Sequence, residues 1–376
     1  MVEPEPSAPV RAHRVEVVDY MRIGAAVAVM CFHYLYNGIK NGKIDSISHE
    51  PVAAFAKYGY LGVDLFFMIS GFVILASATG KNAHRFAVGR ALRLYPAFWV
   101  ALVITTIFSL FLGGDRMGVT PVQFLVNLTM VPSVFGQPFV DGVYWTLLFE
   151  VQFYALVFVL VLFRQGHRVA ALMPAWAILM HVVTLADSSF AHETPYLGGY
   201  FAWFAAGAVI ASISRSGWSA YRAWGLVAAY LTTTPLELNM TSGLKTVCFL
   251  LMLATLVPAV RDLRLPGSKV AGALTYPLYL LHAHIGYMLL ARFADESNKW
   301  LAYGAVSLIV FSMSYGLYVT VERNPSARRF WAWFFENTLG RLVDLLQSGV
   351  DRVLRSLPRG ARSGPRETSS SGAGRH

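Results

Sequence analysis

Two residues that can do chemistry lie on one apolar stretch near the start of the 376-residue chain. Arg22 and His33 are eleven positions apart in the run from Asp19 to His33. At 3.6 residues per turn this is close to three turns, so both side chains share one helix face, about 16 Å apart along the axis. A guanidinium and an imidazole inside an apolar helix are costly in lipid, and such groups usually mark function.

The types of these residues indicate a chemistry. A guanidinium pairs with phosphate oxygens through its fork of N–H groups. A neutral imidazole is a natural general base for an attacking hydroxyl, and a neighbouring carboxylate would orient it. A ligand with phosphates at one end, a slender arm and a reactive tip matches this spacing. Acyl-coenzyme A has that shape.

Composition defines the setting. The chain is 56% hydrophobic and only 14% charged, with a mean hydropathy of +0.50. A soluble domain carries about a quarter charged residues, and apolar runs long enough to cross a bilayer recur along this chain. We therefore predict an all-α, polytopic integral membrane protein with membrane lipid around it. The net charge of +10 lies mostly between the apolar runs, which indicates anionic lipid rather than nucleic acid.

Ten transmembrane helices are predicted, and nine or eleven remain open because the seventh segment is short. The segments are 18–37, 58–78, 91–112, 143–163, 168–186, 197–213, 221–236, 243–260, 270–292 and 300–321. Thirteen Lys and Arg residues fall in one set of alternate loops and seven in the other. The richer set is predicted to face the cytoplasm, so both termini should be cytoplasmic.

This topology gives each polar residue a depth. Four titratable residues from four helices are predicted in the outer half of the membrane: His33, Asp64, Glu150 and His282. Three arginines are predicted below them on the cytoplasmic side: Arg22, Arg90 and Arg93. Taken singly, an arginine can snorkel to the interface and a histidine can be a packing residue. Carboxylates within a span are harder to explain without a partner or a wet cavity.

The remaining segments contain no predicted catalytic domain. Residues 1–15 and 358–376 are rich in Pro, charge, Gly or Ser and are predicted to be disordered. Between them, residues 16–326 form the membrane domain, and 327–357 carry apolar residues at helical spacing, as in a cytoplasmic amphipathic helix. Cys31 and Cys248 lie in apolar runs, so we expect neither a disulfide nor a metal site, and no cleavable signal peptide is evident.

Six short motifs occur in order across residues 16–326, and together they resemble acyltransferase family 3, bacterial integral-membrane O-acyltransferases. They are Asp19 and Arg22 with His33; Gly62-Val63-Asp64-Leu65-Phe66-Phe67 leading to Ser70-Gly71-Phe72; Arg90 and Arg93 before Leu94-Tyr95-Pro96; Trp145-Thr146-Leu147 with Glu150 and Phe153-Tyr154; Tyr276-Pro277-Leu278-Tyr279 with His282; and Glu322 with Pro325.

The resemblance implies a multi-pass protein of the bacterial inner membrane with ten helices. It implies acyl transfer, by default of acetyl, from cytoplasmic acyl-CoA to a hydroxyl of a polysaccharide or lipid-linked glycan, with no bound cofactor. His33 would be catalytic, with Asp64 and Glu150 supporting it. The substrate-binding residues would be Arg22, Arg90, Arg93, Trp145, Tyr154, Tyr279 and His282.

Three departures from the family pattern bear on this interpretation. Thr146 stands where serine is common, and Pro277 replaces a small polar residue, which predicts a kink beside His282. We also expect no appended extracytoplasmic esterase-like domain.

Two roles are possible for His33, that of a general base and that of an acyl carrier. The alternatives from other classes are a transporter or flippase of a glycan or lipid precursor, and a scaffold without chemistry.

Overall fold

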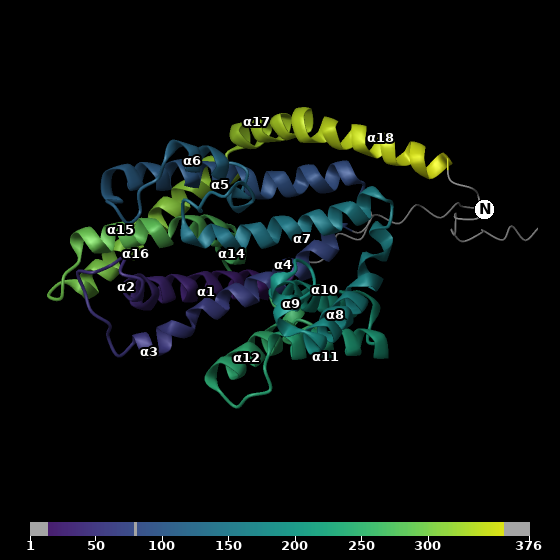
Figure 1. Ribbon diagram of the computed structural model, residues 1–376, viewed down its shortest axis with the longest axis horizontal. Coiled ribbons are helices and arrows are strands. Elements are labelled where there is room, and N and C mark those ends of the chain that lie inside the picture. The colour runs from purple at the N-terminus through teal and green to yellow at the C-terminus, as the bar shows by residue number, and fades with distance from the viewer. Residues whose placement is uncertain (1–13, 79–80, 357–376) are drawn as a thin grey trace, which may run out of the picture.

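The computed structural model describes residues 14–78 and 81–356, and every regular element in these residues is helical (Figure 1). This confirms the predicted all-α class. The predicted disorder of 1–15 and 358–376 falls outside the described residues, apart from residues 14 and 15.

The helices follow one another with short connections. The first nine are α1 (Glu16–Phe32), α2 (Gly38–Lys40), α3 (Ala53–Ala56), α4 (Gly62–Ala78), α5 (Ala83–Leu112), α6 (Pro121–Asn127), α7 (Trp145–Leu162), α8 (Val169–Ala186) and α9 (Ser188–Glu193). The others are α10 (Phe201–Ser216), α11 (Ala220–Thr233), α12 (Met240–Ala254), α13 (Pro258–Arg261), α14 (Ser268–Leu281), α15 (Ala283–Phe293), α16 (Lys299–Leu317), α17 (Pro325–Phe335) and α18 (Arg341–Ser356).

Six helical stretches are long and apolar enough to cross a membrane, and they coincide with six of the ten predicted spans. They are Glu16–Lys40, Ala53–Leu75, Ala83–Leu112, Gly142–Leu162, Gly166–Ala186 and Lys299–Arg323. The other four predicted spans fall on α10, α11, α12 and the pair α14 and α15, which are shorter. The multi-pass class is therefore supported, whereas the number of crossings and the sides of the termini stay predictions.

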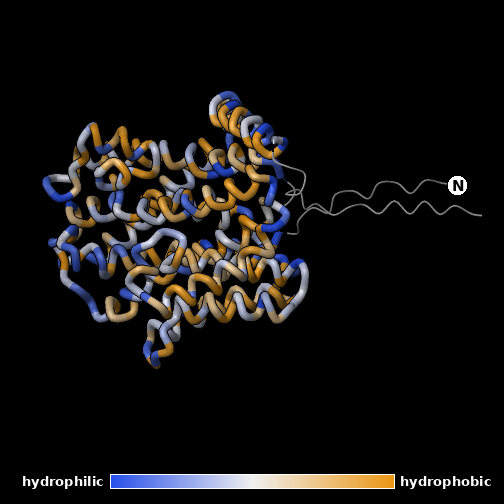
Figure 2. Tube along the Cα trace, turned by 45° about the vertical axis from the view of Figure 1, so that its right-hand side comes forward, coloured by the Kyte–Doolittle hydropathy of each residue, from blue (hydrophilic) through white to orange (hydrophobic). Residues whose placement is uncertain are grey.

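The outer surface of the long helices is apolar. On α5 the side chains of Ile107, Leu110 and Phe111 are 47%, 69% and 81% exposed. Figure 2 shows hydrophobic residues along most helices and hydrophilic ones gathered at the turns. Contiguous exposed apolar surface of this kind fits hydrocarbon rather than water.

The tightest helix contact joins α4 and α10 through two glycines. A Cβ on Gly71 would collide with the backbone carbonyl of Phe204, and one on Gly207 would collide with the carbonyl of Met68. Small residues allow backbones to approach this closely in a membrane helix pair. As a result α10, which is buried all round over most of its length, forms the core against which α4 is held.

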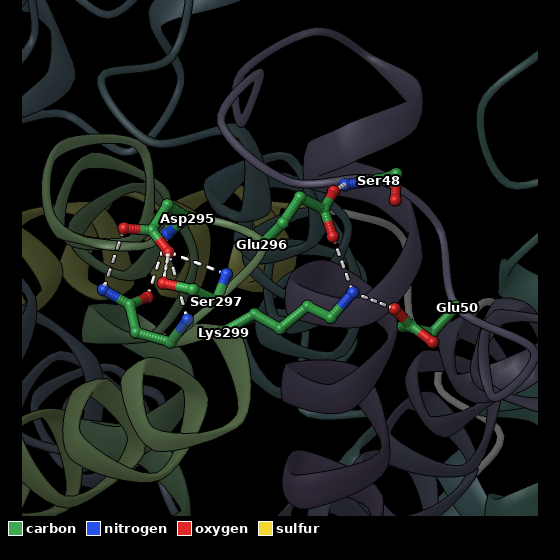
Figure 3. A network of polar contacts seen from close by, with 7 residues as sticks. Ser48, Glu50, Asp295, Glu296, Ser297 and Lys299 are labelled. Atoms are coloured by element: carbon green, nitrogen blue, oxygen red, sulfur yellow. Dashed lines mark hydrogen bonds and ion pairs between the residues drawn. The ribbon is translucent and has the colours of Figure 1, made fainter.

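The bundle has two ends, which we name from α1. The basal end is where α1, α5 and α14 begin, and the distal end is the opposite one. At the distal end, the Lys299 ammonium contacts Glu50 and lies 2.6 Å from Glu296, whose other oxygen accepts the Ser48 backbone N–H at 2.5 Å (Figure 3). This network ties the loop before α3 to the start of α16.

Helices α17 and α18 follow one another along one side of the bundle, beside α5 (Figure 1). His84 at the start of α5 contacts Glu336 at 2.6 Å and Asp344 at 3.0 Å, and Arg164 after α7 pairs with Asp351 at 2.7 Å. The apolar side chains of α18, such as Leu342 and Leu345, point away from the protein and are more than half exposed. An amphipathic helix with such a face is suited to the membrane interface.

Candidate active site

Two cavities lie inside the bundle, one above the other. The basal chamber has a volume of about 210 Å³, and Arg22, Ser70, Arg90, Arg93, Glu150, Tyr154 and Tyr276 contribute to its lining. The distal chamber has a volume of about 410 Å³, and His33, Asn37, Lys43, Asp64, Trp145, His284 and Tyr287 contribute to its lining. Val63 and Tyr279 line both. The two chambers therefore share one wall.

Two of the three arginines that line the basal chamber lie over aromatic rings. The Arg90 guanidinium lies 5.6 Å from the centre of the Tyr154 ring, and that of Arg93 lies 5.3 Å from the Tyr276 ring. Stacking on a ring face holds a guanidinium by cation–π attraction and leaves its N–H edge available for an anion. The chamber is thus a cationic pocket with fixed guanidinium planes.

Glu150 belongs to this basal chamber, which corrects the predicted depth. Its carboxylate accepts hydrogen bonds from the Ser70 hydroxyl, at 3.1 Å, and from the Tyr154 hydroxyl. The sequence interpretation grouped Glu150 with His33, but α7 begins at the distal end and carries Glu150 past the shared wall. The residue therefore balances charge among the arginines, and its catalytic role stays a prediction.

His33 opens a π-helical turn, His33–Asn37, which continues α1. Its Nδ1 forms a hydrogen bond with the Tyr287 hydroxyl, and the Asn37 amide donates to the same hydroxyl oxygen at 3.0 Å. Asn41 in turn donates to the Asn37 side-chain oxygen at 3.0 Å. A π turn is frequently found at functional sites. Here a tyrosine, rather than the carboxylate expected from the sequence, orients the imidazole.

Asp64 lines the same chamber as His33 from the first turn of α4. The residue is only 4% exposed, and its carboxylate makes no hydrogen bond or ion pair within the described part of the chain. A helix N-terminus favours a negative charge in its first turn. Asp64 is therefore a buried group that faces the cavity and is available to a ligand.

A second histidine, His284, was not singled out from the sequence. Its Nε2 lies 2.6 Å from the Lys43 ammonium and accepts the Gly142 backbone N–H at 3.3 Å. Asp141, which is fully buried, accepts the backbone N–H of His284 at 2.9 Å. Because both partners of Nε2 are donors, this nitrogen carries a lone pair. The pair fixes a lysine at the edge of the distal chamber.

His282 lies at the break between α14 and α15. Its Nδ1 donates to the backbone carbonyl of Tyr279 at 2.8 Å, so Nε2 carries the lone pair. That Nε2 is buried and has no partner among the described residues. The His282 and His33 rings are 5.1 Å apart between centroids. A side chain inserted into the backbone ladder five residues after Pro277 accounts for the break.

The shared wall is held by hydrogen bonds. The hydroxyls of Tyr279 and Thr146 are 2.8 Å apart, and each also donates toward the backbone carbonyl of Val143. Thr146 therefore supplies a hydroxyl just as the family's serine would. On the distal side, Trp145 packs against Tyr200 with ring centroids 4.9 Å apart, which gives the distal chamber an aromatic wall.

The structure thus divides the predicted site residues between two chambers. Basal residues are Arg22, Arg90, Arg93, Glu150 and Tyr154, and distal residues are His33, Asp64 and Trp145, with Tyr279 between them. His282, which was also predicted to bind substrate, is not among the residues that line either chamber. Sequence reasoning missed four distal residues: Asn37, Lys43, His284 and Tyr287. Asn37 is four positions after His33, a spacing that places side chains on one helix face, whereas the other three meet the site only through the tertiary fold.

The described residues contain no cluster of three or more His, Cys, Asp or Glu side chains arranged to hold a metal ion.

Comparison with known proteins agrees with this architecture. Residues 15–319 match the family model described as "Acyltransferase domain". This range contains α1 through α16 and all residues of both chambers. No solved structure is significantly similar to the chain.

Three curated relatives are similar to parts of the chain. Nodulation protein 10 of Rhizobium leguminosarum bv. viciae is 29% identical over 43% of this chain and 48% of that protein. The exopolysaccharide production protein ExoZ of Rhizobium meliloti is 27% identical over 60% of this chain and 75% of ExoZ. The peptidoglycan O-acetyltransferase OatA of Listeria monocytogenes is 29% identical over 37% of this chain and 23% of OatA. The matches thus span about half of the first relative and about a quarter of OatA.

The fold and the two chambers define a multi-pass helical protein with polar sites inside an apolar bundle. The chain belongs to the acyltransferase domain family.

Proposed function

We propose that the protein moves an acyl group, acetyl in the simplest case, from acyl-CoA to a hydroxyl of a polysaccharide or lipid-linked glycan. In this proposal the basal end faces the cytoplasm of a bacterial inner membrane. The main observation in support of this proposal is that a cationic chamber and a chamber lined by His33 share a single wall. The similarity to ExoZ, an exopolysaccharide production protein, and to OatA, a peptidoglycan O-acetyltransferase, supports a glycan acceptor.

The donor occupies the basal chamber with its anionic part on the arginines. Its thioester extends past the shared wall at Tyr279 and meets His33 in the distal chamber. Guanidinium groups suit phosphate oxygens, and an elongated donor suits two chambers in series. The acceptor sugar enters the distal chamber, where Trp145 and Tyr200 offer aromatic faces and Asn37 and Asp64 offer hydrogen-bonding groups.

The chemistry takes place at His33. Because Nδ1 is engaged by Tyr287, Nε2 is the nitrogen left to react. With the Nδ1 proton donated to the Tyr287 oxygen, Nε2 carries a lone pair and accepts the proton of the acceptor hydroxyl. The hydroxyl oxygen attacks the thioester carbonyl, the C–S bond breaks, and the proton passes to the departing thiolate. Lys43 lies at the same chamber and provides positive charge for the oxyanion.

An acyl carrier role uses the same nitrogen. Nε2 would attack the thioester itself, release coenzyme A, and pass the acyl group to the acceptor hydroxyl in a second step. Rapid quenching of the protein with labelled acetyl-CoA and no acceptor separates the two. Label bound to His33 supports the carrier. Absence of label, from protein that still transfers acetyl once an acceptor is added, supports the base.

Release of free coenzyme A from acetyl-CoA by purified protein in detergent tests the proposal. His33→Ala is expected to abolish release, at least a hundredfold below wild type, while the melting temperature stays close to wild type. His192→Ala is the matched control, because His192 lies on α9 and bonds the backbone of Ser188. Undiminished release by His33→Ala would contradict the proposal.

The helix formed by α14 and α15 is interrupted at His282. Transporters also contain discontinuous helices, which form their substrate sites. A glycan or lipid precursor transporter is therefore the second candidate. Binding of acetyl-CoA by wild-type protein, measured as a rise in melting temperature, favours the acyltransferase. Absence of binding to any acyl-CoA by folded protein would favour the transporter.

A further inference from the structure

A third cavity lies at the basal end between α5 and α17, and we name it the vestibule. Its volume is about 870 Å³, and its lining includes Arg90, Arg93, Glu322, Arg328, Arg329 and Trp331. Arg90 and Arg93 also line the basal chamber. The vestibule, the basal chamber and the distal chamber therefore follow one another and share lining residues at each boundary.

The vestibule carries an excess of positive charge. Four guanidinium groups face a single carboxylate, that of Glu322, which is paired with Arg93 at 3.4 Å. Arg328 and Arg329 make no ion pair or side-chain hydrogen bond within the described residues, and both are exposed. Like charges gathered around one cavity repel each other, and an anionic ligand relieves that repulsion.

An aromatic ring completes the lining. Trp331 is half-buried, and its ring lies 5.5 Å from that of Trp99 on α5, which anchors the indole beside the cavity. Arginines pair with phosphates, and an aromatic face stacks on a nucleobase. A cavity with both features fits a phosphorylated nucleoside better than a simple anion.

We propose that the vestibule binds the adenosine phosphate end of the acyl donor, with Arg328 and Arg329 contacting its phosphates. This inference rests on the proposed function. A donor whose nucleotide sits between α5 and α17 sends its arm past Arg90 and Arg93 into the basal chamber. Both arginines belong to α17, which begins after residue 319, where the match to the family model ends. Arg328 and Arg329 therefore lie beyond the residues that match the family model.

The test compares two donors that differ only in the nucleotide. Acetyl-CoA carries the adenosine phosphates, and S-acetyl-pantetheine lacks them. The double variant Arg328→Gln with Arg329→Gln is expected to raise the KM for acetyl-CoA about tenfold, with kcat within twofold of wild type. The KM for S-acetyl-pantetheine should be unchanged. Arg323→Gln is the matched control, because Arg323 is exposed near the start of α17 but outside the vestibule lining.

A binding measurement gives a readout that does not depend on turnover. Adenosine 3′,5′-bisphosphate should raise the melting temperature of wild type and of Arg323→Gln, but not that of the double variant. An unchanged KM for acetyl-CoA in the double variant would overturn the proposal, as would an equal loss with both donors. Failure of wild type to use either donor would instead overturn the proposed function.

An anionic lipid headgroup is the other source of phosphate at this interface. The kinetic comparison is therefore repeated in nanodiscs of phosphatidylcholine alone and of phosphatidylcholine with phosphatidylglycerol. A tenfold difference in both membranes supports the donor nucleotide. A difference that appears only with phosphatidylglycerol assigns the arginines to lipid and overturns the proposal.

Discussion

The basal and distal chambers use the same kind of aromatic residue for opposite purposes. In the basal chamber, Tyr154 and Tyr276 present ring faces to the guanidinium groups of Arg90 and Arg93. In the distal chamber, Tyr287 presents its hydroxyl to the imidazole of His33. The tyrosine ring faces of the basal chamber hold guanidinium groups in place, which suits binding of an anion. The Tyr287 hydroxyl of the distal chamber holds the His33 imidazole in place, which suits proton transfer.

This difference teaches how one helix serves two sites. Arg22 and His33 are both on α1 or its continuation, and the spacing between them carries the first into the basal chamber and the second into the distal one. If the basal chamber binds and the distal chamber reacts, changes in the two should alter different kinetic constants.

The largest effect is expected from Arg22→Ala. Loss of a charge-assisted contact of about 2–3 kcal/mol would lower the affinity for acetyl-CoA by about a hundredfold. Isothermal titration of the protein with acetyl-CoA measures this directly. Arg215→Ala, which removes an arginine outside both chambers, should bind as wild type does. If Arg22→Ala bound acetyl-CoA with wild-type affinity, the prediction that the basal chamber binds the donor would be wrong.

A smaller effect is expected from Tyr287→Phe, which keeps the ring and removes the hydroxyl on His33. The kcat for coenzyme A release should fall about tenfold, because the imidazole loses the bond that fixes its orientation. The KM for acetyl-CoA should stay the same. Tyr230→Phe serves as the control, since Tyr230 bonds Thr246 away from both chambers. A rise in KM without a fall in kcat would break the contrast between the chambers.

The smallest effect is expected from Glu296→Gln, a change at the distal surface outside both chambers. The ammonium of Lys299 and the hydrogen bonds from Ser48 lower the pKa of Glu296 to about 2 (Figure 3). A carboxylate with a depressed pKa stabilises the fold above its unfolded pKa, and this contribution is lost as pH falls from about 4.5 toward 2. Glu296→Gln should therefore melt slightly earlier than wild type at pH 6, with the difference shrinking toward pH 3.

The enzymatic activity of Glu296→Gln serves as a reference for the variants of the two chambers. Because Glu296 lies at the distal surface, Glu296→Gln should keep both kcat and KM at neutral pH. A loss of activity without a loss of stability would show that the distal loops contribute to the reaction.

Sequence reasoning named residues that line both chambers where their placement follows local periodicity. The spacing of Arg22 and His33 on one helix, and the order of the motifs, pointed to the residues of both chambers. It failed where placement depends on distant segments. Tyr287 meets His33 across 254 positions of sequence, and only the packing of α15 against the end of α1 brings them together. Glu150 was assigned to the wrong chamber because depth alone does not locate the shared wall.

The vestibule lay beyond sequence reasoning for a similar reason. Arg328 and Arg329 read as part of an amphipathic surface helix, and nothing local indicates that α17 folds back over α5. Likewise, Pro277 predicted a kink beside His282. The sequence did not predict that the Nε2 atom of His282 is left without a partner among the described residues, because this depends on hydrogen bonds that only the three-dimensional structure shows.

The wall formed by Tyr279 and Val63 also matters to the membrane as an electrical insulator. A unit charge crossing a membrane held at 100 mV releases about 2.3 kcal/mol. Two polar cavities joined end to end would give protons and ions a wet path along that gradient. We expect the phenol of Tyr279, which bonds to Thr146 and Val143, to narrow that path. Under the proposed function, an acyl group would then pass between the chambers without an open channel.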